Sequence, residues 1–112
     1  MKGDLLYLTN ISDCLAQIES YTQSGRDSFL ASRMAQDAVI RNLEIFGEAT
    51  KRLSPGLREK HADLPWRQMA GLRDVLIHDY ARVDAEEVWG IVERDLPALQ
   101  VRIEAMLQAA TD

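Results

Sequence analysis

The stretch AVIRNLEIFGEATKRL, residues 38–53, decides the fold class of this chain. Its apolar side chains recur three or four residues apart, which is the period of an α-helix with one buried face. That stripe consists of Val39, Leu43, Phe46, Thr50 and Leu53. A second apolar strip runs beside it: Ala31, Ala35, Ala38, Ile45 and Ala49. We therefore expect a long helix over residues 28–53 that is covered on two sides, and the second cover could be another subunit.

The same helical period recurs on both sides of this stretch. A first helix is expected over residues 4–22, closed by Gly25, with Asp27 or Ser28 capping the next helix. Ser54-Pro55-Gly56 ends the long helix, and a short helical turn is expected over residues 57–61.

Two further helices complete the prediction. One follows Asp63 as its cap and ends near His78, and the last begins after Asp84 with a kink at Pro97. Strand signals are weak throughout. The sequence predicts a single all-α domain over residues 1–112, an antiparallel four-helix bundle with an additional short helix.

Composition excludes several classes of protein. The 112 residues carry a net charge of −5, so any binding of nucleic acid needs a local cationic patch, which two subunits could assemble. One cysteine, Cys14, excludes an internal disulfide and a four-cysteine zinc site. No metal site and no cofactor are expected. No apolar run is long enough for a signal peptide or a membrane span, so we expect a cytoplasmic protein without membrane association.

The segment GLRDVLIHDY, residues 71–80, carries the candidate chemistry. Arginine binds phosphate oxygens, histidine moves protons near neutral pH, and tyrosine can stack on a base. Arg73, His78 and Tyr80 together suit RNA cleavage by the neighbouring 2′-hydroxyl. The alternative is structural, with His78 as a helix C-cap and Tyr80 in the core.

Geometry limits how these groups can cooperate. Asp74 and His78 are four residues apart and share one face of a helix. Arg73 and His78 are five apart, which places them about 140° apart around an ideal helix. For them to cooperate, either the helix ends before His78 or the same segments of two subunits meet at a twofold axis.

RDVLIHDY matches the Arg-x4-His-x-Tyr pattern of the HepT-like branch of the HEPN superfamily. Three further segments resemble that branch in the same order: AVIRNLEIFGEATKRLS, LPWRQMAGLRD and VWGIVERDLPAL. The resemblance runs from about residue 5 to residue 107, nearly the whole chain.

The resemblance implies an all-α homodimer and a metal-independent endoribonuclease, the toxin of a type VII-like toxin–antitoxin pair. It makes Arg73 and His78 the catalytic pair. Tyr80 would bind RNA and receive AMP from a minimal nucleotidyltransferase antitoxin similar to MntA. Many relatives have asparagine directly after the arginine, whereas this chain has Asp74, which could orient His78 or repel RNA.

Three polar residues of the long helix, Arg41, Glu44 and Glu48, share one stripe. They are either a solvated ladder of ion pairs or a polar lining of the dimer cleft that helps to set Arg73. Gly47, in mid-helix, indicates that another helix packs closely there. The main rival function is a non-catalytic HEPN subunit that serves as scaffold in a nucleotidyltransferase complex, and a third is a purely structural helical dimer.

Overall fold

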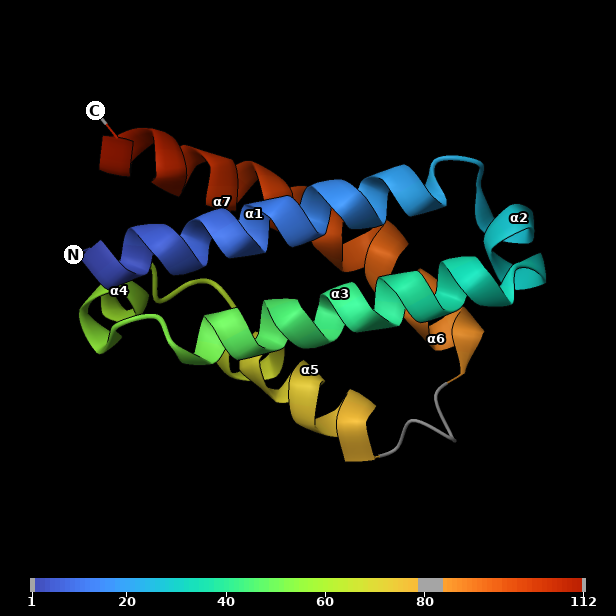
Figure 1. Cartoon of the computed structure of the whole chain (residues 1–112). Helices are drawn as coiled ribbons and strands as arrows, with labels where there is room; N and C mark the ends of the chain where they lie inside the picture. Colours follow the sequence, from blue (N-terminus) through green and yellow to red (C-terminus); the bar gives the residue numbers. More distant parts are fainter. Residues whose placement is uncertain (1, 79–83, 112) are drawn as a thin grey trace.

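The computed structural model describes residues 2–78 and 84–111, and every regular element in these ranges is helical (Figure 1). The all-α prediction is confirmed for this part of the chain. The elements are α1 (Lys2–Thr22), α2 (Arg26–Ala31), α3 (Arg33–Lys51), α4 (Pro55–Lys60), α5 (Trp66–His78), α6 (Ala85–Gly90), the π-helical η2 (Ile91–Asp95) and α7 (Leu96–Thr111). Among the described helices, none has both the length and the apolar content that a membrane crossing requires.

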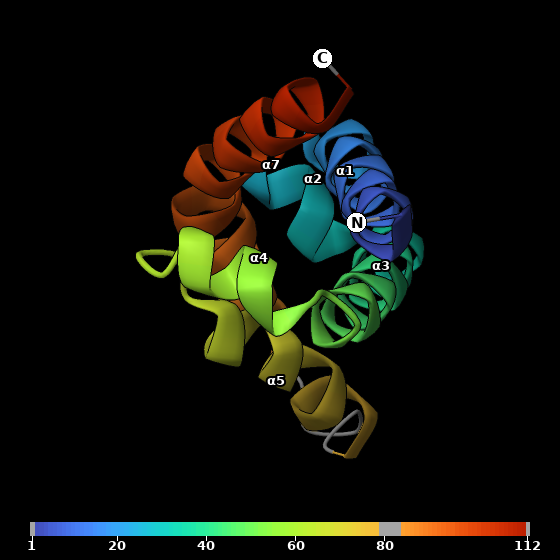
Figure 2. The same cartoon turned by 90° about the vertical axis from the view of Figure 1, so that its left-hand side faces the viewer.

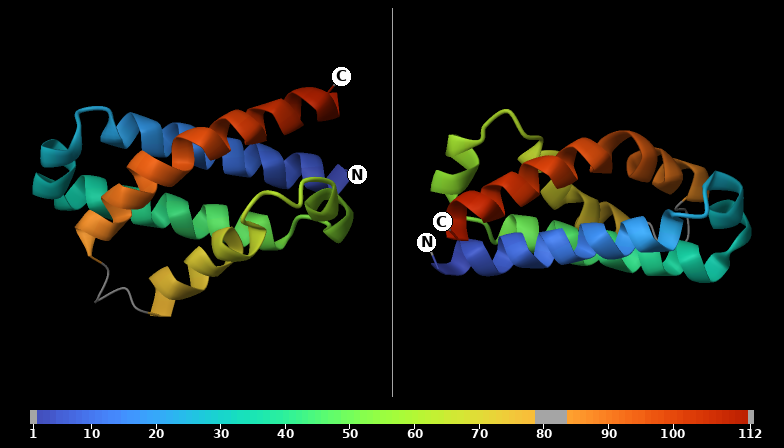
Figure 3. Two further views of the ribbon diagram at one scale, coloured as in Figure 1. Left: turned by 180° about the vertical axis from the view of Figure 1, so that it is seen from behind. Right: turned by 90° about the horizontal axis from the view of Figure 1, so that it is seen from above.

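Helix α3 occupies the middle of the structure. It runs antiparallel to α1 on one side and packs against α5 on the other (Figure 1). The second apolar strip is covered only in part, because Ile45 remains 42% exposed, and a cover from another subunit stays a prediction. Viewed end-on, α5 extends away from the ring formed by α1, α3 and α7 (Figure 2). Seen from behind, α6, η2 and α7 run obliquely across α1 and α3 (Figure 3). The core between these helices is largely apolar, with Phe29, Leu43, Phe46 and Ile103 at most 1% exposed. Thr50 is also fully buried, and its hydroxyl donates to the Phe46 carbonyl at 2.8 Å.

The prediction of a single helix over residues 28–53 is wrong, because the helix is interrupted at Ser32. The backbone of Ser32 is extended (φ −115°, ψ 104°), and its hydroxyl accepts a hydrogen bond from the Ala35 N–H at 3.1 Å. Ser32 is therefore the N-cap of α3. The predicted caps Asp27 and Ser28 lie inside α2, whose N-cap is Gly25 at φ 96°. The break lets Phe29 on α2 turn into the core.

Two other predicted helix starts have opposite outcomes. Asp84 caps α6 as expected and accepts from the Glu86 N–H at 2.9 Å. Asp63 is not a cap, because α5 begins three residues later, at Trp66. The Asp63 carboxylate instead accepts hydrogen bonds from Arg102 on α7, and this contact lowers the pKa of Asp63.

The interruption expected at Pro97 lies one turn earlier, as the π-helical turn η2. The Leu96 N–H donates to the Ile91 carbonyl, five residues back. Pro97 has no N–H to donate and its ring crowds the preceding turn, so a widened turn there accommodates it without ending the helix.

Candidate functional site

Gly47 lets the backbone of Arg73, on α5, lie directly against α3. A Cβ built on Gly47 would lie 2.8 Å from the Arg73 backbone nitrogen and 2.9 Å from its Cβ. Real Cβ atoms do not approach that closely, so only glycine allows α5 to pack on α3 at this point. The close packing predicted from the mid-helix glycine is confirmed, and its consequence is the position of Arg73.

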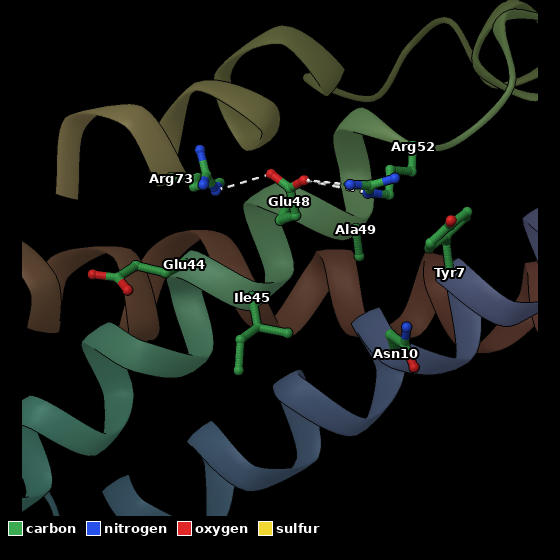
Figure 4. Close-up of a pocket in the computed structure, with 8 residues that line it drawn as sticks. All are labelled: Tyr7, Asn10, Glu44, Ile45, Glu48, Ala49, Arg52 and Arg73. Carbon is green, nitrogen blue, oxygen red and sulfur yellow. Dashed lines mark hydrogen bonds and ion pairs between the residues drawn. The ribbon is translucent and has the colours of Figure 1, made fainter. Parts of the chain in front are cut away.

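Charged side chains of α3, of its C-cap and of α5 alternate in sign around Arg73, and we call this set the ion-pair chain: Arg52, Glu48, Arg73, Asp74 and Lys51. Figure 4 shows the part of it formed by Arg52, Glu48 and Arg73. The Arg73 Nε lies 2.9 Å from Glu48 Oε2, and its Nη1 lies 3.5 Å from Asp74 Oδ1. Glu48 also pairs with Arg52 at 3.1 Å, and Asp74 pairs with Lys51 at 2.9 Å.

The ion-pair chain orients the Arg73 guanidinium more than it stabilises the fold. Its side chains are 36% to 58% exposed, and ion pairs at such sites contribute little to folding because water screens them. Two carboxylates on different sides of the Arg73 guanidinium nevertheless restrict how it can turn. Arg73 is 36% exposed, so an anion can still reach it.

A groove of about 410 Å³ lies beside Arg73, across the outer face of α3. It is lined by Tyr7 and Asn10 of α1, by Glu44, Ile45, Glu48 and Ala49 of α3 with its C-cap Arg52, and by Arg73 of α5 (Figure 4). Glu44 and Glu48, two of the three residues of the polar stripe predicted on this helix, line this groove. Arg41 is exposed and is not among the residues that line it.

His78 is the last residue of α5, so the helix does not end before it. Arg73 and His78 therefore occupy one continuous helix, and the arrangement with an earlier helix end is not the one adopted. The side chain of His78 lies outside the described residues, as does Tyr80 entirely. That two subunits bring these groups together stays a prediction.

The sequence alone assigned no role to Tyr7, Asn10, Lys51 or Arg52. Tyr7 and Asn10 are three residues apart, so they share a face of α1. This spacing is visible in the sequence, but both residues lie beside the buried apolar face of α1, so it does not indicate a separate site. The pairing of Lys51 with Asp74 carries no signal in sequence, because the residues are 23 apart.

Other candidates from the sequence do not contribute to this site. Cys14 is buried, and burial, with a smaller contribution from Asp13, raises the pKa of its thiol to about 11. Trp89 is partly buried against the core, with its ring centroid 5.6 Å from that of Phe29. Within the described ranges, no three His, Cys, Asp or Glu side chains come together as a metal site.

Comparisons with a family model and with known proteins indicate the same family. The family model described as "Ribonuclease HepT-like" matches residues 11–106. The protein named "Probable ribonuclease HepT" of Thermococcus cleftensis is 40% identical over 101 residues, covering 89% of this chain and 92% of that protein. A "Putative RNase" of Caldanaerobacter subterraneus subsp. tengcongensis is 36% identical, covering 96% of this chain and 97% of its own length.

A longer relative is also similar. The "Gamma-glutamylcyclotransferase and putative RNase" of Methanocaldococcus jannaschii is 40% identical over 110 residues, which are 96% of this chain but 50% of that protein. The chain thus spans half the length of this relative and nearly all of the other two. No solved structure matches the chain.

Proposed function

This chain belongs to the ribonuclease HepT-like family of the HEPN superfamily, and from that premise we propose that it is a metal-independent endoribonuclease acting as a homodimer. The observation that carries the proposal is Arg73. It lies in the Arg-x4-His-x-Tyr segment, it is held in place by Gly47 and two carboxylates, and it borders an open groove. The names of the relatives support RNA as the substrate.

The proposed reaction needs two kinds of group. The 2′-hydroxyl attacks the adjacent phosphorus, and His78 takes its proton as general base. The bond from phosphorus to the 5′-oxygen breaks, and that oxygen takes a proton from solvent water. Arg73 stabilises the charge that builds on the phosphate oxygens. The products are a 2′,3′-cyclic phosphate and a 5′-hydroxyl end.

One copy of the helix does not supply both faces of the phosphate, since the two positions lie about 140° apart on α5. A twofold axis beside α5 would pair Arg73 of one subunit with His78 of the other. Glu48 and Asp74 act as positioning residues for Arg73, and Arg41 contributes positive charge farther along α3.

The family resemblance also supports a regulatory role. We propose that the protein is a cytoplasmic toxin whose antitoxin is a minimal nucleotidyltransferase similar to MntA. The antitoxin would transfer AMP onto Tyr80. Added bulk and negative charge two residues from His78 would exclude an RNA phosphate from the site.

A second candidate is a non-catalytic scaffold subunit of a nucleotidyltransferase complex. One observation favours it: two carboxylates already neutralise Arg73, and an RNA phosphate has to compete with them. The net charge of −5 adds to that repulsion.

RNA cleavage by purified protein in EDTA, with His78→Ala prepared in parallel, separates the two candidates. Endoribonuclease action predicts 2′,3′-cyclic phosphate ends with wild type and none with His78→Ala. If neither protein cleaves RNA while mass confirms an unmodified Tyr80, the scaffold function replaces the enzyme.

A further inference from the structure

The α1 wall of the groove has no part in the mechanism above. Tyr7 and Asn10 are both half-buried and both line the groove, at the end away from Glu44 (Figure 4). A volume of about 410 Å³ falls in the range of small-molecule sites, and it is large enough for one nucleotide.

Tyr7 lines the groove together with the charged residues that orient Arg73. Arg52 and Arg73 both pair with Glu48, at 3.1 Å and 2.9 Å. The proximity of Tyr7, followed by that of Glu48, raises the pKa of the Arg52 guanidinium. The aromatic ring of Tyr7 therefore borders the same groove as the phosphate-binding arginine.

The floor and the far wall of the groove suit a base. Ile45, 42% exposed, and Ala49 provide an apolar floor. In the part of the chain that the structure describes, the Asn10 side-chain amide has no protein hydrogen-bond partner. An amide offers donors and an acceptor together, which is what the edge of a base requires.

We propose that this groove binds one unpaired nucleotide of single-stranded RNA beside the phosphate at Arg73, with its base stacked on Tyr7 and its edge hydrogen-bonded to Asn10. This inference rests on the proposed ribonuclease function. A base within a duplex could not reach Tyr7, so the substrate is single-stranded. The groove holds two cations (Arg52, Arg73) and two anions (Glu44, Glu48), so recognition depends on stacking rather than on backbone charge.

The test is binding of a fluorescent RNA oligomer with 2′-O-methyl sugars, which cannot be cleaved, to the full chain. Tyr7→Leu removes the aromatic face, Tyr7→Phe keeps it, and Asn10→Ala removes the amide. Tyr21→Leu is the matched control, because Tyr21 is an exposed tyrosine of the same helix outside the groove. Loss of base stacking is expected to weaken binding about fivefold or more for Tyr7→Leu. Asn10→Ala is expected to weaken binding too, whereas Tyr7→Phe and Tyr21→Leu stay within about twofold of wild type.

Several outcomes overturn the inference. Equal affinity of wild type, Tyr7→Leu and Asn10→Ala does so, and so does absence of binding by wild type. A changed oligomeric state of Tyr7→Leu with unchanged RNA affinity would assign the groove to a subunit interface instead. Should Tyr7→Leu fail to fold by circular dichroism, Asn10→Ala and an oligomer with abasic residues decide the matter.

Cleavage of ordinary RNA, measured in parallel, distinguishes this inference from the proposed function. If wild type and Tyr7→Leu cut the same bonds with the same KM, the subsite is disproved while the ribonuclease stands. If wild type binds the oligomer through Tyr7 yet cleaves nothing, the ribonuclease fails and the nucleotide site stands.

Discussion

Gly47 matters because it has no side chain, which leaves room for α5 to pack against α3. In Gly47→Ala the new methyl group would lie 2.8 Å from the Arg73 backbone, so α5 has to move. Overpacking of this kind costs about 1–3 kcal/mol, which exceeds the roughly 1 kcal/mol that alanine gains in a helix. We expect a net loss of unfolding free energy in urea, together with reduced RNA cleavage.

Gly71→Ala is the matched control for that experiment. A Cβ at Gly71 meets nothing within 4 Å, so the substitution in α5 is expected to stabilise the protein by up to about 1 kcal/mol. Equal effects of the two alanine substitutions would contradict the close approach of α5 to α3.

Glu48 is expected to matter for rate rather than for stability. Glu48→Gln removes the charge that holds the Arg73 Nε, and a misdirected guanidinium is expected to lower kcat about tenfold or more with little change in KM. The unfolding free energy should change by less than about 0.5 kcal/mol. The control is Asp37→Asn, which removes another α3 carboxylate paired with an arginine, outside the groove, and should leave kcat unchanged.

At the scale of elements, Ser32 separates α2 from α3. Ser32→Ala removes the hydroxyl that accepts from the Ala35 N–H, and loss of an N-cap costs about 1 kcal/mol. For a domain of this size the melting temperature should fall by several degrees, about 4–8 °C per kcal/mol. Ser28→Ala, at one of the caps that the sequence suggested, should leave it nearly unchanged. A larger fall in melting temperature for Ser28→Ala than for Ser32→Ala would contradict the interruption at Ser32 and support a single long helix.

The elements that the sequence predicted well are those whose signal is local. The first helix, expected over residues 4–22, and the cap at Asp84 depend only on near neighbours in the chain. The break at Ser32 was hidden because the alanine strip continues across it and no Glu or Gln follows three residues later to complete a capping box. The Asp63–Arg102 and Lys51–Asp74 pairs join distant segments, and only the packed helices bring them together.

In the candidate site, too, some residues are predicted by local sequence signals and others depend on how the helices pack. Arg73 and Glu48 were predicted from the family pattern and from helical spacing, and the structure brings them together at 2.9 Å. The groove that they border depends on how α1 lies beside α3, so Tyr7 and Asn10 could not be assigned to it from spacing alone.

At the scale of the whole molecule, the central claim is that the active site is shared between two copies of the chain. Helix α5 is continuous through both Arg73 and His78, so we assign the two groups at one phosphate to opposite subunits. Arg73→Ala and His78→Ala should each be inactive alone. A heterodimer of the two variants, however, contains one site with an intact arginine and an intact histidine.

The most direct measurement is RNA cleavage after the two variants are unfolded together in equal amounts and refolded. Half of the dimers should be mixed and half of their sites intact, so the account predicts roughly a quarter of wild-type activity. Each variant taken alone through the same treatment, with dimer formation checked by light scattering, is the control. If the mixture remains as inactive as its components while the dimers exchange, Arg73 and His78 act within one chain and the shared site is contradicted.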